Sequence, residues 1–142
     1  MEAGDDLLGL VRKDGSVAAV QTPDEIQVIL ARLAGQEIAV LQVLGINSLK
    51  SFSPMPSALT GDTIESSAVV DRLFTVITTG HQVKVDLQRT GRVVWLPRTE
   101  PYVMSAGTSR PTLRLVLASG QGLDLTEPAK TKRIAVTISA RP

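Results

Sequence analysis

The sequence predicts a mainly β fold with one long helix, arranged as a two-layer β-sandwich or pseudobarrel of about eight strands. Three observations predict it. Only one segment has the caps and the apolar spacing of an amphipathic helix, short runs with apolar alternation fill most of the rest, and turn residues separate those runs. The 142 residues suffice for one domain that buries about two-thirds of its surface on folding.

The chain begins with a predicted extension over residues 1–21, followed by the sandwich domain over residues 22–142. Within the extension, two apolar runs flank Lys13-Asp14-Gly15, which is typical of a β-hairpin turn.

The helix is predicted from Pro23 to Ala34. Thr22 and Glu25 form a capping box around a proline at the first helical position, and Gly35 favours a left-handed stop. We expect the apolar face to be buried against the sheets. That face consists of Ile26, Ile29, Leu30 and Leu33.

Strands and turns are predicted for the remainder. Val83, Val85 and Leu87 alternate with polar residues, which is the period of a half-buried strand. Two longer loops are predicted at residues 48–57 and 97–111. The predicted strands cover residues 37–44, 63–70, 73–78, 82–87, 92–96, 113–117, 123–125 and 133–138.

Composition excludes several kinds of site. The chain has no cysteine, which excludes disulfides, thiolate metal sites and thiol nucleophiles, and its single histidine, His81, excludes any site that needs two imidazoles. We therefore expect no metal and no cofactor. No apolar run approaches the ~18 residues that span a bilayer, and no signal peptide opens the chain, so we expect no membrane association and a cytoplasmic location.

The net charge of +1 hides an asymmetry along the sequence. Residues 1–83 contain five basic and ten acidic side chains, whereas residues 84–142 contain ten basic and four acidic ones. Gathered on one face, the cations would form a phosphate-binding surface; dispersed by folding, they are ordinary solvated charges. The sequence leaves both interpretations open.

A series of motifs carries a resemblance to a known family. In chain order they are Pro23-Asp24-Glu25-Ile26, Leu59-Thr60-Gly61-Asp62-Thr63-Ile64, Asp71-Arg72-Leu73, Asp86-Leu87-Gln88-Arg89-Thr90-Gly91-Arg92 and Leu123-Asp124-Leu125-Thr126-Glu127-Pro128. Their order and spacing over about residues 22–136 resemble the N-terminal domain of the formamidopyrimidine-DNA glycosylase and endonuclease VIII family. The resemblance implies that family's β-sandwich fold.

The resemblance also implies DNA as a partner, bound weakly through its phosphates. Arg72 matches the place of a phosphate-contacting lysine, and Arg89 the place of a void-filling methionine. A basic segment replaces the family's Arg-Arg-Phe-Gly. The candidate DNA-binding residues are Arg72, Arg89, Arg92, Lys130 and Lys132.

The family's catalytic chemistry is not kept in the sequence. Family enzymes attack the sugar with the free amine of an N-terminal proline, whereas Pro23 follows other residues and has an amide nitrogen. Ser66, His81 and Asp86 contain the letters of a hydrolytic triad without its motif. We expect no catalytic residues.

Three hypotheses follow. The first is a stand-alone, degenerate relative of a base-excision-repair glycosylase domain that binds nucleic acid weakly and lacks lyase activity. The second is an active DNA glycosylase or lyase with relocated residues, and the third is a structural protein-interaction module. The identity of a protein partner is left open.

Overall fold

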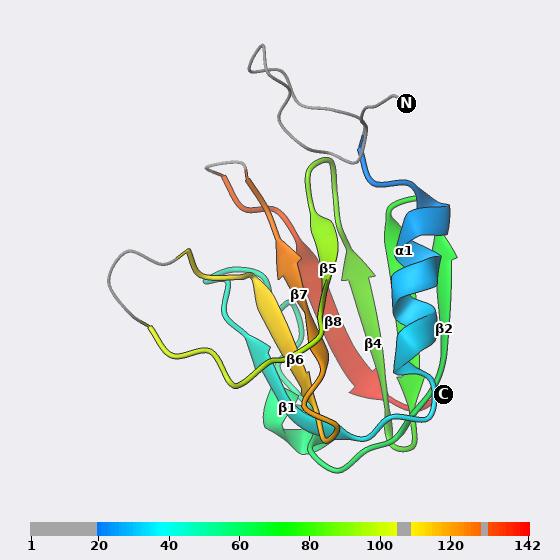
Figure 1. Cartoon of the computed structure of the whole chain (residues 1–142). Helices are drawn as coiled ribbons and strands as arrows, with labels where there is room; N and C mark the ends of the chain where they lie inside the picture. Colours follow the sequence, from blue (N-terminus) through cyan, green and yellow to red (C-terminus); the bar gives the residue numbers. More distant parts are fainter. Residues whose placement is uncertain (1–19, 105–108, 129–130) are drawn as a thin grey trace.

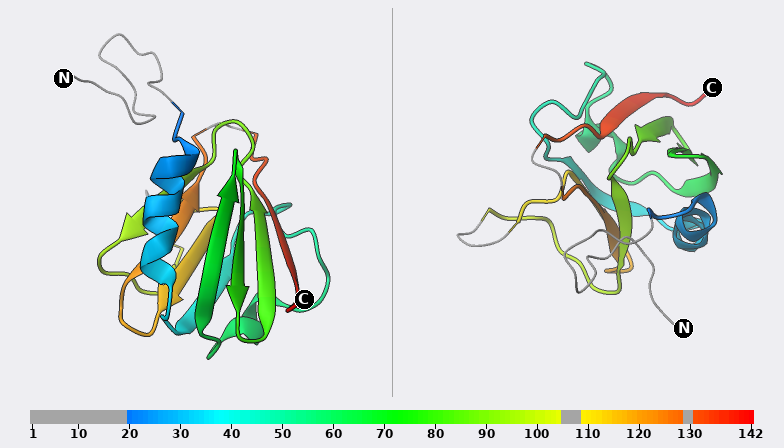
Figure 2. Two further views of the ribbon diagram at one scale, coloured as in Figure 1. Left: turned by 90° about the vertical axis from the view of Figure 1, so that its right-hand side faces the viewer. Right: turned by 90° about the horizontal axis from the view of Figure 1, so that it is seen from above.

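The computed structural model describes residues 20–104, 109–128 and 131–142. In this part of the chain the strands form two antiparallel four-stranded sheets, which pack face to face (Figures 1 and 2). The predicted two-layer sandwich is therefore confirmed. The first sheet has the order β1 (Ile38–Val43), β6 (Leu113–Leu117), β7 (Gly122–Thr126) and β5 (Arg92–Leu96). The second has the order β2 (Ile64–Val70), β3 (Leu73–Thr78), β4 (His81–Asp86) and β8 (Ala135–Ala140).

The helix α1 (Pro23–Leu30) begins where the capping box predicts. The Glu25 amide donates to Thr22 Oγ1 at 3.2 Å, and the Thr22 amide donates to Glu25 Oε1 at 2.7 Å. Two amides that no helical carbonyl can reach are thereby bonded. The predicted start of the helix is confirmed.

The α-helix is shorter than predicted. It ends at Leu30 and tightens into the 3-10 turn η1 (Ala31–Leu33), after which Gly35 adopts a φ of +80°. A last turn of this kind is common because it gives the final carbonyls closer partners. Of the predicted apolar face, Ile29 is only partly buried. The other three side chains, Ile26, Leu30 and Leu33, are buried.

The helix closes one side of the sandwich. It lies against β2 of one sheet and β5 of the other, so that it covers the gap between two sheet edges (Figure 2). This placement brings Gln21, just before the helix, next to the start of β5.

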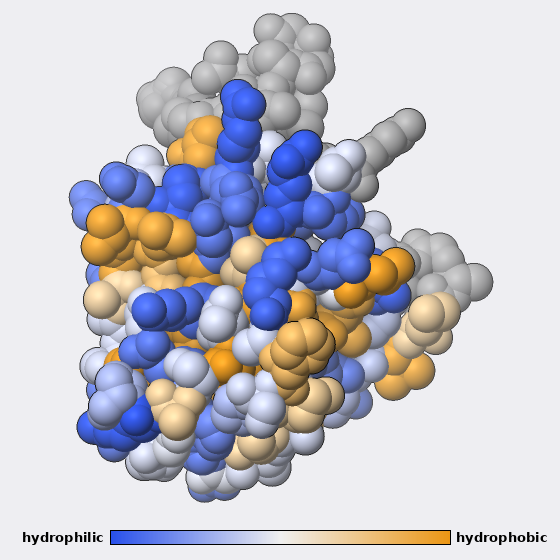
Figure 3. Space-filling view, turned by 180° about the vertical axis from the view of Figure 1, so that it is seen from behind, coloured by the Kyte–Doolittle hydropathy of each residue, from blue (hydrophilic) through white to orange (hydrophobic). Residues whose placement is uncertain are grey.

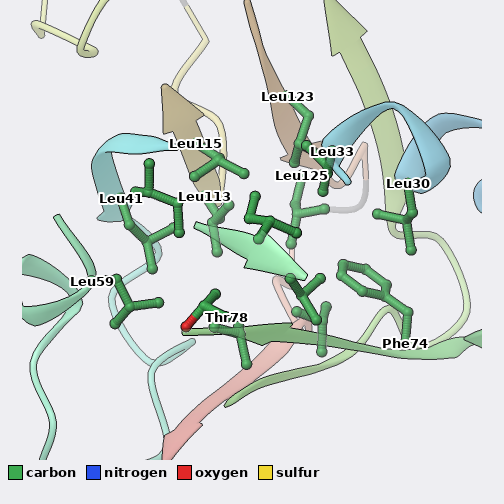
Figure 4. A pocket seen from close by; sticks show the side chains of 15 residues that line it. Leu30, Leu33, Leu41, Leu59, Phe74, Thr78, Leu113, Leu115, Leu123 and Leu125 are labelled. Carbon is green, nitrogen blue, oxygen red and sulfur yellow. The ribbon is translucent and has the colours of Figure 1, made fainter. Parts of the chain in front are cut away.

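The core lies between the two inner sheet faces. Register pairs such as Leu113 with Leu125 and Leu115 with Leu123 place aliphatic side chains on the inner face of the first sheet. A small internal cavity of about 40 Å³ remains among them, lined by aliphatic side chains, Phe74 and Thr78 (Figure 4). A site this small and apolar is a packing defect of the core.

Two further segments cover the opposite side of the sandwich. Residues 48–50 run parallel to β8, with the Lys50 amide donating to the Val136 carbonyl and the Val136 amide to the Ser48 carbonyl, each at 2.8 Å. On the free edge of β1, Gln42 pairs with the backbone of Tyr102 through both its amide nitrogen and its oxygen. Both sheet edges are thereby partnered.

Besides the helix end, two predicted boundaries differ from the structure by more than one residue. The predicted loop 48–57 ends in a 3-10 turn, η2 (Pro56–Leu59), because Leu59 is fully buried and anchors it. The last strand begins at Ala135, two residues late, because the amides of Arg133 and Ile134 bind a side chain and not a strand. The predicted hairpin within residues 1–21 falls outside the described residues.

Candidate nucleic-acid interface

Three connections meet at one end of the sandwich. The register pairs Asp86 with both Leu73 and Ala135, and Arg92 with Thr126. The β2–β3 turn, the β4–β5 turn and the β7–β8 connection therefore lie at the same end, beside the start of α1 (Figure 1). We call it the basic end and define it by Arg89, Arg92, Lys132 and Arg133, which all lie in these connections or at the first residue of β5.

Arg72 ties these connections together. Its Nε donates to the Gln88 carbonyl and one terminal nitrogen to the Gln21 carbonyl, both at 2.8 Å. The other terminal nitrogen donates to the Gly91 carbonyl. The planar fork of a guanidinium can serve three carbonyls from separate segments, which an ammonium on a flexible stem cannot do as well. The Arg72 side chain is half-buried and engaged within the protein.

The electrostatics of Arg72 follow from this position. Burial lowers the pKa of Arg72 below its ordinary value, and the neighbouring charge of Arg92 lowers it further, whereas Asp86 acts in the opposite direction. The guanidinium remains charged, since its ordinary pKa lies far above neutral pH. Arg72 and Arg92 are therefore like charges close enough to interact, which makes this end an unfavourable place for more cations and a favourable one for an anion.

The β4–β5 turn has a backbone that presents Arg89 outward. The Gln88 amide donates to Asp86 Oδ1 at 2.9 Å, and Gln88 adopts a φ of 57°. Gly91 closes the turn through its amide to the Leu87 carbonyl at 3.0 Å. A Cβ at Gly91 would lie 2.5 Å from that same carbonyl oxygen, so the turn requires glycine there.

Gln21 is a structural contact at this end that no sequence pattern singles out. Its side-chain amide donates to the Val93 carbonyl and its side-chain oxygen accepts from the Val93 amide, both at 2.9 Å, so that it pairs with β5 as a strand would. Its own carbonyl receives Arg72. The residue is 5% exposed. A polar side chain 72 positions away from its partner in the chain leaves no periodic signal.

Glu127 organises the β7–β8 connection. Its carboxylate accepts the amide of Arg133 at 2.8 Å and that of Ile134 at 3.1 Å, and Lys132 donates to its carbonyl. Glu127 is 7% exposed, so its negative charge faces backbone amides rather than solvent. It therefore holds the connection in place through backbone amides.

The structure brings together four of the five predicted site residues: Arg72, Arg89, Arg92 and Lys132. The fifth, Lys130, lies outside the described residues. Arg89, Lys132 and Arg133 are exposed and Arg92 is half-buried. Within the described ranges, the side chains of Arg89, Arg92 and Arg133 have no hydrogen-bond or ion-pair partner. Seen from behind, strongly hydrophilic side chains gather along this part of the surface (Figure 3).

Pro23 and Glu25 both have structural roles in the helix. Pro23 occupies the first turn of α1, where its missing N–H is not needed, and Glu25 accepts the Thr22 amide. The start of the helix thus accounts for both residues.

A second polar cluster occupies the opposite end, around Asp62. Asp62 Oδ2 accepts from the Thr78 hydroxyl at 2.7 Å, lies 2.7 Å from His81 Nδ1, and accepts the Gly80 amide at 3.3 Å. Burial acts to raise the pKa of Asp62, but these hydrogen bonds and the charge of His81 together hold it below its ordinary value. His81 thus pairs with Asp62 and lies at the start of β4, while Asp86 lies at its far end.

The described ranges contain neither a candidate metal site nor a membrane-spanning helix. They contain no group of three His, Asp or Glu side chains that could hold a metal ion. They also contain no helix long and apolar enough to cross a membrane.

No described protein family matches this sequence, and no curated protein matches it. Solved structures do match its fold. The Fpg (MutM) protein of Lactococcus lactis, in complex with DNA containing Fapy-dG, superimposes with a TM-score of 0.62 at 15% identity, over 83% of this chain and 41% of that one. The complex of that protein with THF-DNA and an inhibitor gives 0.63 with the same identity and coverage. The complex with DNA containing an abasic site gives 0.62, over 83% and 40%.

The resemblance expected from the motifs is therefore confirmed at the level of the fold, which is that of the Fpg N-terminal β-sandwich. This chain spans about 40% of the length of the Fpg chains that it matches.

Proposed function

We propose that this chain is a degenerate relative of a base-excision-repair DNA glycosylase domain, which binds nucleic acid through phosphates at the basic end and has no lyase chemistry. The observation that carries the proposal is the set of partnerless cations at that end. Arg89, Arg92 and Arg133 lie on connections that the fold brings together, and the nearby Glu127 carboxylate is bonded to backbone amides. Charges arranged in this way attract an anion.

The role proposed for Arg72 differs from that of its neighbours. Because three carbonyls accept its donors, we assign it the task of positioning the β4–β5 turn and not of gripping a phosphate. Direct phosphate contacts are assigned to Arg89, Arg92, Lys132 and Arg133, with Lys130 retained from the sequence.

The absence of lyase chemistry is proposed from the helix start. A Schiff base requires a free amine, and the nitrogen of Pro23 is an amide within the chain. The carboxylate of Glu25, two positions after Pro23, is bonded to the Thr22 amide. Arg72, at the place of the family lysine, cannot lose a proton at neutral pH and so cannot serve as a base.

The DNA complexes of Lactococcus lactis Fpg support a duplex as the first probe. We expect a dissociation constant near the non-specific range of about 10⁻⁴ to 10⁻⁶ M at physiological salt, with an affinity that falls steeply as salt rises. Phosphate contacts from the four described cations alone would give a slope of log K against log salt of about −3 to −4. Fluorescence anisotropy with a labelled duplex across salt concentrations measures both.

Borohydride trapping on abasic duplex DNA tests the second half of the proposal. We expect no covalent adduct. A trapped adduct that disappears when amines are blocked would instead establish an active lyase with relocated residues. An absence of any salt-dependent DNA binding would favour a protein-interaction module.

A further inference from the structure

An open groove of about 540 Å³ adjoins the basic end on the side of β1 and β8. Three segments line it: residues 45–48, 109–112 and 131–132. The last of these belongs to the same β7–β8 connection as Arg133, and Lys132 belongs to both the groove and the basic end. A ligand that follows the surface from the basic end would enter this groove.

Two buried hydroxyl groups line the groove. Ser48 is 3% exposed and Thr112 is 4% exposed. Within the part of the chain that the structure describes, neither hydroxyl has a hydrogen-bond partner, although buried polar groups in proteins normally have one. Both residues are held by their backbones, since the Thr112 carbonyl accepts the amides of Leu44 and Gly45 and the Ser48 carbonyl accepts that of Val136.

The remaining polar lining suits an anion. Arg110 and Lys132 contribute two positive charges and Asn47 a side-chain amide, and none of the described residues that line the groove has a carboxylate. Arg110 is exposed and, among the described residues, has no partner for its guanidinium. Hydroxyl and amide groups can donate hydrogen bonds to the oxygens of a phosphate group, and the cations can balance its negative charge.

We propose that this groove is a phosphate-binding site, in which the Ser48 and Thr112 hydroxyls donate to phosphate oxygens and Arg110 and Lys132 supply the balancing charge. The phosphate comes either from a nucleic-acid backbone or from a free phosphate compound. The nucleic-acid case rests on the proposed function, because a strand bound at the basic end reaches the groove along the connection that contains Lys132 and Arg133.

The first arm of the test uses inorganic phosphate and the full chain. In amide-detected NMR titrations, we expect saturable shifts at Asn47, Ser48 and Thr112. Thr112→Val, which removes the hydroxyl but keeps the shape, should weaken phosphate binding about tenfold and leave the melting temperature unchanged or higher, because an unbonded hydroxyl is lost. Thr137→Val, at an exposed position on β8, is the matched control and should leave phosphate binding unchanged.

The second arm uses a DNA duplex and separates the sources. If the groove holds a backbone phosphate, Arg110→Gln should make the salt slope shallower by about one unit, whereas Arg98→Gln, an exposed arginine beyond β5, should not. Saturable phosphate shifts with an unchanged slope would support the site and assign it to a free phosphate compound.

Two results would overturn the groove site: no saturable shift with phosphate together with no slope change for Arg110→Gln, or a clear loss of stability in Thr112→Val. Failure of the proposed function has a different signature. In that case the duplex would not bind at all, while the phosphate titration could still saturate.

Discussion

The two ends of the sandwich are organised by charged residues of opposite sign. At the basic end, Arg72 donates to three backbone carbonyls. At the other end, Asp62 accepts from a hydroxyl and a backbone amide and lies against His81. Each side chain bonds to segments that are distant in sequence, so Arg72 and Asp62 have the same kind of structural role.

The ends differ in the charge that remains after these bonds are made. Around Asp62, His81 faces the carboxylate and the nearby Arg141 pairs with Glu65. Around Arg72, the cations Arg89, Arg92 and Arg133 have no partner among the described residues. The two ends therefore differ in their partnerless cations and not in the organising charge itself, and these cations are the reason that we propose binding at the basic end only.

Removing the organising cation should have the largest effect. Arg72→Ala leaves three carbonyls without their donor and should lower the free energy of unfolding by about 3 kcal/mol, measured by urea denaturation. Arg72→Lys keeps the charge but loses the fork, and should recover only part of that loss. Full recovery by lysine would mean that charge and not geometry holds this end together.

Removing the organising anion should cost somewhat less. Asp62→Ala should lower the free energy of unfolding by about 2 kcal/mol, because the Thr78 hydroxyl and the Gly80 amide lose their acceptor.

The same carboxylate makes a pH prediction. The pKa of Asp62 is lower in the folded than in the unfolded chain. Its contribution to the free energy of unfolding is therefore complete above about pH 4, and it is lost as the pH falls through the pKa of the folded state. Asp62→Asn should therefore flatten the acid limb of a stability–pH curve. An acid limb identical to that of the parent protein would contradict the assignment.

Loss of the helix cap at the basic end should cost less again. Thr22→Ala removes the acceptor of the Glu25 amide and should lower the free energy of unfolding by about 1 kcal/mol. Thr22→Ser retains the hydroxyl and serves as the control, which should stay close to the parent protein. An equal loss of stability in both variants would mean that the Thr22 hydroxyl does not stabilise the start of the helix.

The smallest effect concerns the cavity that Thr78 lines, next to the Asp62 cluster (Figure 4). Val85→Ile adds one methylene to a side chain that lines this cavity of about 40 Å³ and should raise the free energy of unfolding by about 0.5–1 kcal/mol. Val136→Ile, at a fully buried position away from the cavity, should be destabilising instead. Stabilisation by both would mean that the core is loosely packed throughout.

Local signals in the sequence predicted the elements well and the long-range contacts poorly. The capping box placed the start of α1, and apolar alternation placed Val83 and Val85 on the inner face of β4. Both signals depend on neighbours within a few residues. The end of the α-helix at Leu30 was missed because a 3-10 turn continues the same apolar spacing.

From the sequence, Arg72, Arg89 and Arg92 were expected to lie close together, and the structure places all three at one end. Their contacts within the protein were not predicted. That Arg72 bonds to three carbonyls, and that Gln21 completes the edge of β5, depends on segments that only the closed sandwich brings together. The pairing of His81 with Asp62, 19 positions earlier, is another such contact, and it leaves the His81 side chain only 17% exposed.

The most direct test of the central claim compares two pairs of cations with the same change in net charge. Arg89→Gln with Arg133→Gln removes two partnerless cations from the basic end, whereas Lys84→Gln with Arg98→Gln removes two exposed cations elsewhere. Anisotropy titrations with a DNA duplex across salt concentrations give the slope for each. We expect a slope shallower by about two units for the first pair and no change for the second. Equal slopes for both pairs would contradict binding at the basic end, because binding would then depend on net charge alone.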